Sequence, residues 1–259
     1  SAPPMARLAS TKPAEDQVIR QHSKQFLASL GFCEIVSYSF ISRRAIELLR
    51  LGEDDQRQQL LPLRNPLSED QAVMRTSLIP GMLETAAGNQ RQNNFNLRLV
   101  ELSKVFFPRG KDELPEERFN LCGLLSGMRR PSAWNEPPQT VDFFDVKGAV
   151  EALFLGLGVR DVHWTKKDTA PYLNPEVASR IVVADTYLGD VGEIHPSVLE
   201  SYDLKGPVYL FDIDFDLLME KAVSLKEFQP LPRFPAVNRD LALVVSNSVA
   251  AQDLLDYLE

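Results

Sequence analysis

The chain has 259 residues, a formal net charge of −8, 44% hydrophobic residues and 25% charged residues. This length and composition predict a globular protein with one large domain, or a large domain followed by a small one. The acidity excludes a broad nucleic-acid-binding surface, because a negative protein repels the phosphate backbone. No apolar run approaches the roughly 20 residues of a membrane span, and the start, SAPP, has no signal-peptide pattern. We therefore expect a cytoplasmic protein that does not contact a membrane.

The first predicted element is a helix over residues 13–30, with Thr11 as a candidate N-cap. Gly31 follows it at the usual position of a helix stop. The apolar face of this helix is predicted by residues that recur every four positions, Val18, His22 and Phe26, with Ile19 and Leu30 beside them.

The next part of the chain reads mainly as strands. Residues 34–40 predict a strand, and Ser42 can cap a short helix that ends near residue 49. Polar loops are predicted over 52–59 and 109–118. The second loop separates two predicted strands, 96–107 and 119–125.

A clearer helix follows, because six apolar residues recur with helical spacing: Val146, Ala149, Val150, Leu153, Phe154 and Leu157. Gly158 ends this stripe, and Asp145 is a candidate N-cap. We predict burial against a sheet for four of the six, Val146, Val150, Leu153 and Phe154.

The remaining body is predicted to be strand-rich. Strands are expected at 162–165, 178–184, 187–194 and 208–214, with a tight turn at Asp185-Thr186 and a short helix opened by His195-Pro196. Short connections between neighbouring strands favour antiparallel pairing. The pattern therefore predicts an α+β fold, with a mainly antiparallel sheet flanked by helices.

The end of the chain predicts a boundary and a second domain. Three prolines within residues 229–235 predict a stiff connector. Residues 240–245 predict a strand and 250–258 a helix, which cannot bury a core of their own. We therefore divide the chain into a body over 1–222, a Pro-rich connector over 223–235, and the start of a second domain over 236–259.

The residues announce little chemistry. There is no phosphate-binding glycine loop and no zinc-ligand spacing, and Cys33 and Cys122 are interpreted as buried, reduced thiols. His22 and His163 are interpreted as core residues. His195 could cap a helix, bind a ligand or fix a turn, with a structural role favoured.

Charged residues are likewise given structural roles first. Ser68 with Gln71 fits a capping box, and Asp145 a helix cap, rather than paired catalytic carboxylates. Four scattered arginines are interpreted as solvated or ion-paired surface: Arg91, Arg98, Arg129 and Arg130. We assign no catalytic, cofactor-binding or metal-binding residue.

Four segments, in order along the chain, nevertheless carry a specific resemblance: NPLSEDQAVMRTSLIPGML at 65–83, VDFFDVKG at 141–148, GDVGEIHP at 189–196 and RFPAVNRDLAL at 233–243. They resemble the β subunits of bacterial phenylalanyl-tRNA synthetases, and the resemblance covers essentially the whole chain. It implies a module related to the class II synthetase core without its catalytic residues. After residue 235 it implies the start of a ferredoxin-like anticodon-binding domain.

The resemblance also implies partners and cofactors. The module would pack against the catalytic α subunit in an (αβ)₂ heterotetramer that charges tRNA-Phe with phenylalanine, using ATP and Mg²⁺. No cofactor is expected in this part of the chain. The expected α-subunit contacts are the first helix and residues 67–91, and the isolated chain is expected to expose an apolar patch and self-associate.

The residues themselves favour a non-catalytic role for the chain on its own. A class II site holds phosphate oxygens with arginines. The strand of the second class II motif corresponds to 99–107, which offers Lys104 but no arginine. The third corresponds to 208–219, which has no glycine or arginine and carries Asp212, Asp214 and Asp216.

Two alternatives remain, and one segment departs from the family pattern. A self-sufficient class II-like adenylating or amino-acid-binding protein would be favoured by arginines on these strands. A tRNA-binding module would be favoured by a basic surface. Residues 172–179 (YLNPEVAS) stand where the family commonly has a His-Pro-Gly-Arg-type segment, so the role of that loop is not carried over.

Overall fold

The computed structural model describes residues 14–110, 113–131 and 133–222, together with residues 237, 239–246, 249, 254, 257 and 258. The chain divides into two compact units, Ser1–Leu225 and Lys226–Glu259. Over the described residues, no helix combines the length and the apolar character that a membrane crossing requires.

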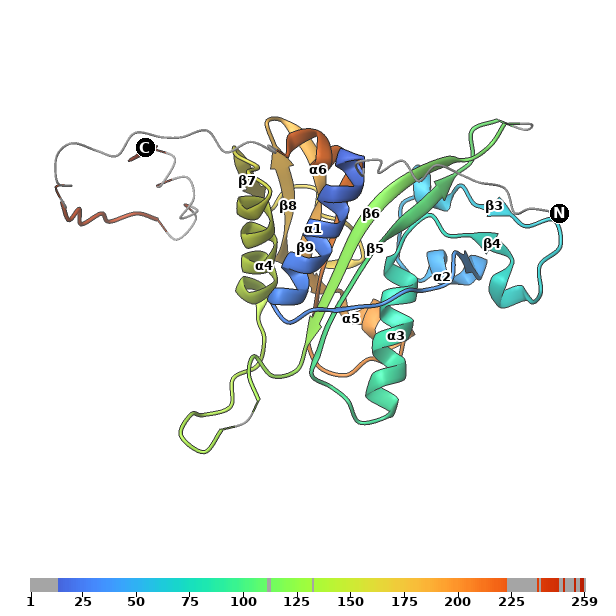
Figure 1. The fold of residues 1–259 in the computed structure, drawn as a ribbon. Coiled ribbons are helices and arrows are strands. Elements are labelled where there is room, and N and C mark those ends of the chain that lie inside the picture. Colours follow the sequence, from blue (N-terminus) through green and yellow to red (C-terminus); the bar gives the residue numbers. More distant parts are fainter. Residues whose placement is uncertain are drawn as a thin grey trace, which may run out of the picture. The chain divides into compact units, whose positions relative to one another are not determined.

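The first unit is built around a seven-stranded sheet (Figure 1). Its strands, in spatial order, are β1 (Cys33–Glu34), β5 (Leu97–Phe107), β6 (Glu116–Ser126), β10 (Val208–Asp214), β9 (Thr186–Ile194), β8 (Leu173–Val183) and β7 (Val162–Thr165). All neighbours are antiparallel except β1, which runs parallel to β5. The predicted α+β class with a mainly antiparallel sheet is thus confirmed.

Helices cover both faces of this sheet, and each face has its own apolar core (Figure 1). One face carries α1 (Glu15–Ser29), α4 (Phe143–Gly156) and α6 (Phe215–Lys221). The other carries α2 (Arg43–Glu47), α3 (Ile79–Arg91) and α5 (Pro196–Ser201). A small sheet of β2 (Phe40–Ile41), β4 (Val73–Met74) and β3 (Leu61–Pro62), and the 3₁₀ turns η1 (Gln56–Gln58) and η2 (Glu69–Gln71), complete the unit.

Helix α4 confirms the predicted stripe and corrects its cap. Val146, Val150, Leu153 and Phe154 are fully buried against the sheet. The N-cap is Asp142, whose side chain accepts from the amides of Phe144 and Asp145. Asp145 is the third residue of the helix, and its side chain accepts a hydrogen bond from the amide of Asp142, which completes a capping box.

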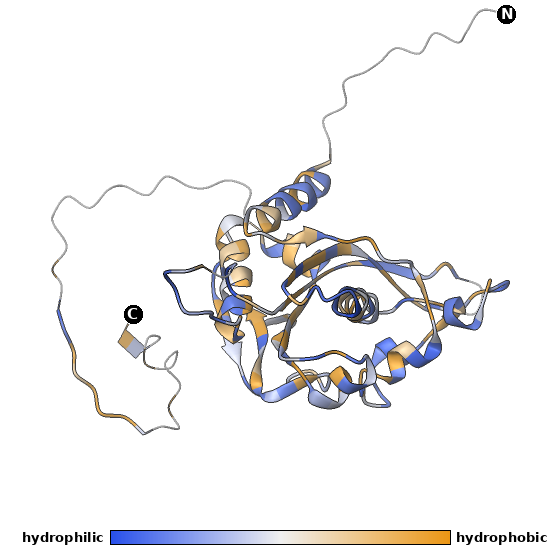
Figure 2. Cartoon of the chain, turned by 90° about the horizontal axis from the view of Figure 1, so that it is seen from below, coloured by the Kyte–Doolittle hydropathy of each residue, from blue (hydrophilic) through white to orange (hydrophobic). Residues whose placement is uncertain are grey.

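The predicted apolar face of α1 is confirmed only in part, because Ile19, Phe26 and Leu30 pack against the core whereas Val18 and His22 do not. It begins at Glu15 after an uncapped Ala14, and Thr11 lies outside the described residues. The buried residues are Ser23 and Leu27, whereas Val18 is 50% exposed and His22 is exposed. Val18 precedes Leu27 by nine residues, which is half a turn around the axis and so faces away. Figure 2 shows that the turns of α1 nearest the N-terminus are largely hydrophilic.

The predicted strand over 34–40 is divided in two. Its ends belong to different sheets, as β1 and β2. Between them, Ser37 uses its amide and hydroxyl to bind the side chain of Glu101 instead of a neighbouring strand. The chain leaves the large sheet here because a buried carboxylate satisfies its backbone.

Several local predictions are also corrected. Ser42 caps α2 through its hydroxyl as expected, but the side chain of Ser68 makes no capping bond at η2. The tight turn consists of Ala184 and Asp185, both with positive φ, so it comes one residue earlier than predicted. Cys122 is buried but Cys33 is exposed, and His163 on β7 is exposed rather than in the core.

The second unit gives a mixed outcome. Residues 240–245 were predicted to form a strand, but they are exposed and pair with no strand among the residues that the structure describes. Leu254, Tyr257 and Leu258 are helical, as predicted for 250–258. The predicted connector over 223–235 lies outside the described residues.

Candidate functional site

A row of polar side chains crosses the sheet face that carries α2 and α3. Directly opposed residues of antiparallel strands point to the same side of a sheet, so the strand register defines this row. It crosses β5, β6, β10, β9 and β8 in that order: Glu101, Cys122, Asp212, Asp190 and Arg180. Three carboxylates therefore share one row of a largely covered face, where each needs a cation or hydrogen-bond donors.

Arg75 neutralises the first of these carboxylates. Its Nη1 lies 2.8 Å from Oε1 of Glu101, and the two side chains are only 4% and 1% exposed. Arg75 also donates from Nε to the carbonyl of Lys104, while the Ser37 hydroxyl donates to the second oxygen of Glu101. Arg75 is therefore bound to groups inside the core and is not available to a ligand.

Arg57 stands beside the second carboxylate. Its Nε and Nη2 bind the two oxygens of Asp55 at 2.9 and 2.7 Å, and its Nη1 lies 3.9 Å from Asp212. Its guanidinium also lies over the ring of the buried Tyr172, 5.3 Å from the centroid. Arg57 is in the segment expected to be a polar loop, and sequence reasoning missed it. The Asp55-x-Arg57 spacing predicts a local ion pair, but it does not predict that this pair lies beside Asp212 of β10.

Burying the carboxylates of this row costs electrostatic free energy. Burial raises the pKa of Asp212 to about 6, although Arg57 and a long hydrogen bond from Asn120 act against it. Burial also raises the pKa of Asp190, which accepts a hydrogen bond from the hydroxyl of Tyr187. Oδ1 of Asp190 is buried with no hydrogen-bond partner among the described residues. The Arg57 contact is thus too distant to compensate fully for the desolvation of these two carboxylates.

A cavity of about 270 Å³ opens beside this row. Of the three acids expected to repel a triphosphate, Asp212 and Asp214 line the cavity, and Asp214 also caps α6. Asp216 has a different role: its carboxylate accepts a hydrogen bond from the backbone amide of Phe119. The cavity contains two cations, Arg57 and Arg118, which are paired with Asp55 and Glu116. Within the described parts of its wall, no unpaired cation faces a phosphate.

The other residues considered at the sequence level have local roles. Lys104 pairs with Glu117 on the exposed part of the β5–β6 ribbon. His195 caps α5, because its Nδ1 accepts from the amide of Ser197. The segment 172–179 is the start of β8, and Tyr172 supports Arg57. Over the described residues, no three His, Cys, Asp or Glu side chains gather as a metal site.

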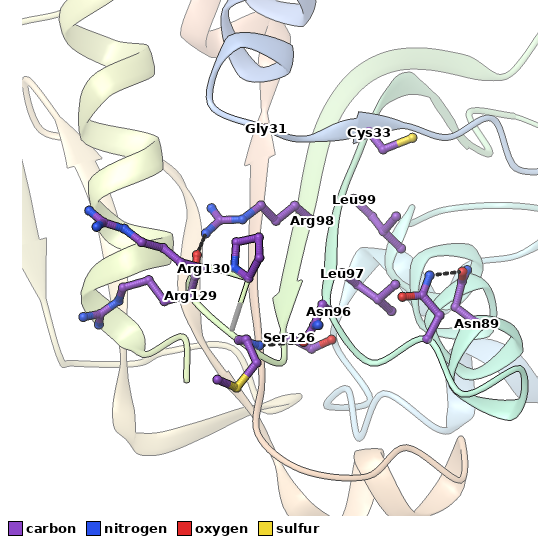
Figure 3. Close-up of a pocket in the computed structure, with 13 residues that line it drawn as sticks. Gly31, Cys33, Asn89, Asn96, Leu97, Arg98, Leu99, Ser126, Arg129 and Arg130 are labelled. Carbon is purple, nitrogen blue, oxygen red and sulfur yellow. Dashed lines mark hydrogen bonds between the residues drawn. The ribbon is translucent and has the colours of Figure 1, made fainter. Parts of the chain in front are cut away.

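A second cavity, of about 430 Å³, lies between the end of α1 and the start of β5 (Figure 3). It brings together Arg98, Arg129 and Arg130, three of the arginines that the sequence left scattered. Arg98 extends from β5 and donates from Nη2 to the carbonyl of Arg129 at 2.9 Å. Arg129 itself binds Asp142 and Asp145 at the start of α4, and Arg130 lies 3.8 Å from the exposed Glu136.

Comparison with known proteins identifies the relatives of this chain. Residues 1–215 match the family model described as the phenylalanyl tRNA synthetase beta chain CLM domain. The phenylalanine–tRNA ligase beta subunit of Geobacter sulfurreducens is 35% identical over 252 residues, which are 97% of this chain and 32% of that protein. That of Moorella thermoacetica is 38% identical over 243 residues, which are 94% of this chain and 30% of that protein. The chain thus spans about a third of the length of the curated relatives it matches.

Solved structures show the same fold at low sequence identity. Two structures of pyrrolysyl-tRNA synthetase from Desulfitobacterium hafniense superpose with TM-scores of 0.60 and 0.61, at 15% and 16% identity. They cover 82% and 85% of this chain, and the chain covers 71% and 76% of them. The likeness extends to the fold alone, and a class II-like architecture fits the antiparallel-rich sheet described above.

Proposed function

This chain belongs to the family of phenylalanyl-tRNA synthetase β chains, and we propose that it is a non-catalytic assembly part of a phenylalanine–tRNA ligase. In this proposal the α subunit performs the ATP- and Mg²⁺-dependent charging of tRNA-Phe, and the chain supports it within a cytoplasmic (αβ)₂ heterotetramer. The chain itself carries no catalytic, cofactor-binding or metal-binding residue. Its part after residue 235 is the start of an anticodon-binding domain.

The observation that carries the non-catalytic role is that Arg75 and Arg57, which reach the polar sheet face from other segments, are bound in ion pairs, while Arg180 on the same face stands directly opposite the carboxylate of Asp190. Adenylation brings two anions together, an amino-acid carboxylate and a triphosphate, so the site must supply free positive charge. Arg75 is bound to Glu101, and Arg57 is bound to Asp55. Asp212 and Asp214 add negative charge to the same cavity. The face is therefore stabilised as a core and is not prepared for phosphate.

An apolar edge supports the assembly role. Val36 and Tyr38, in the segment between β1 and β2, are 85% and 75% exposed, and Phe40 is also exposed. They alternate with residues that point inward, so one side of this extended segment is apolar. A cavity of about 570 Å³ beside it is lined by Val36, Tyr38, Gln71 and Glu84 among others. We assign this edge to the α subunit, because interface cores are rich in such side chains.

This assignment refines the contacts expected from the sequence. Within residues 67–91, the apolar side of α3 is buried in the chain's own core, whereas Leu67 is 93% exposed. The available parts of that range are its beginning and the side of α3 that carries Gly81 and Glu84, which lines the cavity beside Val36 and Tyr38. Helix α1 can contribute only its outer side, which carries Val18. Self-association of the isolated chain would follow from the same uncovered edge.

Co-purification with an α subunit tests the proposal. A tagged α subunit co-expressed with the chain should retain it through size-exclusion chromatography. Val36→Asp should weaken this retention, because it places a charge on the apolar edge. Leu155→Asp is the matched control, since Leu155 is 76% exposed, close to the 85% of Val36, but lies on α4. Failure of the unaltered chain to bind any α subunit would overturn the assembly role.

A further inference from the structure

We infer that the cavity around Arg98 receives a carboxylate side chain of the α subunit when the two chains assemble. This inference rests on the proposed function, since it supplies a specific polar contact to the interface proposed there. The cavity lies between the end of α1 and the start of β5, and Arg98 reaches into it (Figure 3).

Arg98 is a cation that the chain itself leaves uncompensated. Its Nη2 donates to the carbonyl of Arg129, and no carboxylate lies within ion-pair distance of it among the residues that the structure describes. A guanidinium has five N–H donors in a rigid fork, which fits the two oxygens of a carboxylate. One of these donors is occupied by the carbonyl, so a face of the fork is left for an external acceptor.

The surroundings hold Arg98 in place before any partner arrives. Gly31, whose φ of +88° favours glycine, lies beside this side chain, and a Cβ there would be in ordinary van der Waals contact with Cδ of Arg98 at 3.6 Å. The acceptor carbonyl is fixed because the side chain of Arg129 binds Asp142 and Asp145. The amide of Met128 donates to Oδ1 of Asn96 at 2.8 Å. A cation ordered in this way loses little conformational entropy when it is bound.

The charges favour a single protein carboxylate over an RNA backbone. The chain has a net charge of −8, so it does not attract a polyanion over a distance. Arg129 is neutralised by Asp142 and Asp145, and Arg130 has Glu136 nearby. One uncompensated guanidinium in a recess suits one carboxylate, whereas phosphate-backbone binding relies on several cations at once.

The position of the cavity also agrees with the proposed interface. Cys33 lines the cavity, and the exposed Val36 follows it by three residues. The apolar edge and the cavity are therefore consecutive along the same segment. An apolar contact with an adjacent ion pair is a common arrangement, in which the charge pair fixes the register of the two partners.

The test measures the affinity of the 259-residue chain for its α subunit by biolayer interferometry. Arg98→Gln should raise Kd by roughly 30-fold or more, since loss of one member of a buried charge pair costs this much. Arg98→Lys, which keeps the charge but loses the fork, should give a smaller rise. Arg160→Gln, an exposed cation elsewhere with the same change of charge, should leave Kd unchanged. Unchanged thermal unfolding of each variant confirms that it is folded.

The outcomes are distinguishable. If the unaltered chain binds the α subunit and Arg98→Gln binds equally well, the inference is wrong while the proposed assembly role stands. If the unaltered chain does not bind, the proposed function itself fails. If Arg98→Gln leaves α-subunit binding intact but weakens tRNA binding by the assembled complex, the cavity is an RNA phosphate site and the inference is overturned.

Discussion

Asp212 on β10 lies directly opposite Asp190 on β9, so two buried carboxylates are neighbours on one face of the sheet. Among the described residues, one arginine, Arg57, approaches Asp212, at 3.9 Å from its carboxylate. Burial raises the pKa of both carboxyl groups, that of Asp212 to about 6. The folded chain therefore binds protons at this point more tightly than the unfolded chain does.

Asp212→Asn should reduce the pH dependence of stability. A folded-state pKa above the unfolded value means that the free energy of unfolding decreases as pH rises from about 4 to about 6. Between pH 4.5 and 7.5, this one group contributes a loss on the order of 2 kcal/mol. Urea unfolding at both pH values should show a loss smaller by about that amount in Asp212→Asn. Asp203→Asn, an exposed control, should retain the full loss.

The buried Arg75–Glu101 pair should show strong coupling in a double-mutant cycle. Arg75→Met leaves the Glu101 carboxylate buried without its cation and should cost about 3–5 kcal/mol. Glu101→Gln should be similarly harmful, because Arg75 then lies buried beside a neutral amide. The double variant Arg75→Met with Glu101→Leu should be more stable than Arg75→Met alone. Additive losses in chemical denaturation would contradict this account.

Two glycine-to-alanine substitutions should have opposite effects on stability. A Cβ at Gly189 would lie 2.0 Å from the carbonyl oxygen of Asp212, so Gly189→Ala must push β9 and β10 apart. We expect a loss of several kcal/mol. Gly148 lies within α4, and a Cβ there meets nothing within 4 Å. Gly148→Ala should stabilise the chain by roughly 0.5–1 kcal/mol. Thermal melts of both variants measure the contrast.

The chain alone should not form phenylalanyl-adenylate. Each missing preorganised contact to the transition state costs on the order of 3–4 kcal/mol, and two would slow the reaction by roughly 10⁴-fold or more if the costs add. Phenylalanine-dependent pyrophosphate exchange should stay at the level without enzyme. Exchange well above that level and abolished by Arg98→Ala would instead make the chain a self-sufficient adenylating protein.

Amide exchange should differ sharply between the two units. Leu121–Leu125 lie in β6, paired on both sides within the large sheet. Leu241–Val245 are exposed and outside any strand. Hydrogen exchange measured on dilute monomer should therefore be far slower at 121–125. Equal protection of the two segments would mean that 241–245 gains a strand partner in solution.

Local patterns in the sequence predicted most of the secondary structure. The stripe of Val146, Val150, Leu153 and Phe154 predicted α4 and its buried side, because helical periodicity is a property of consecutive residues. Strands β7 and β10 were predicted with their observed bounds, because strand patterns are likewise a property of consecutive residues. The buried side of α1 was predicted only in part, with Val18 and His22 placed on it wrongly, because its few apolar residues do not form one unambiguous stripe.

The sequence by itself determined the fold class and, through four ordered segments, the family. Only the tertiary structure decided which charges meet. Arg75 and Glu101 are 26 residues apart, and Arg57 and Asp212 are 155 apart, so no local spacing reveals either pair. The sequence shows that residues 99–107 and 208–219 contain no arginine. It does not show that Arg57 and Arg75 reach the polar face from other segments, or that Arg98 has no carboxylate partner among the described residues. The physical reason is that electrostatic interactions depend on distance in space and on burial, and the register of the sheet sets both.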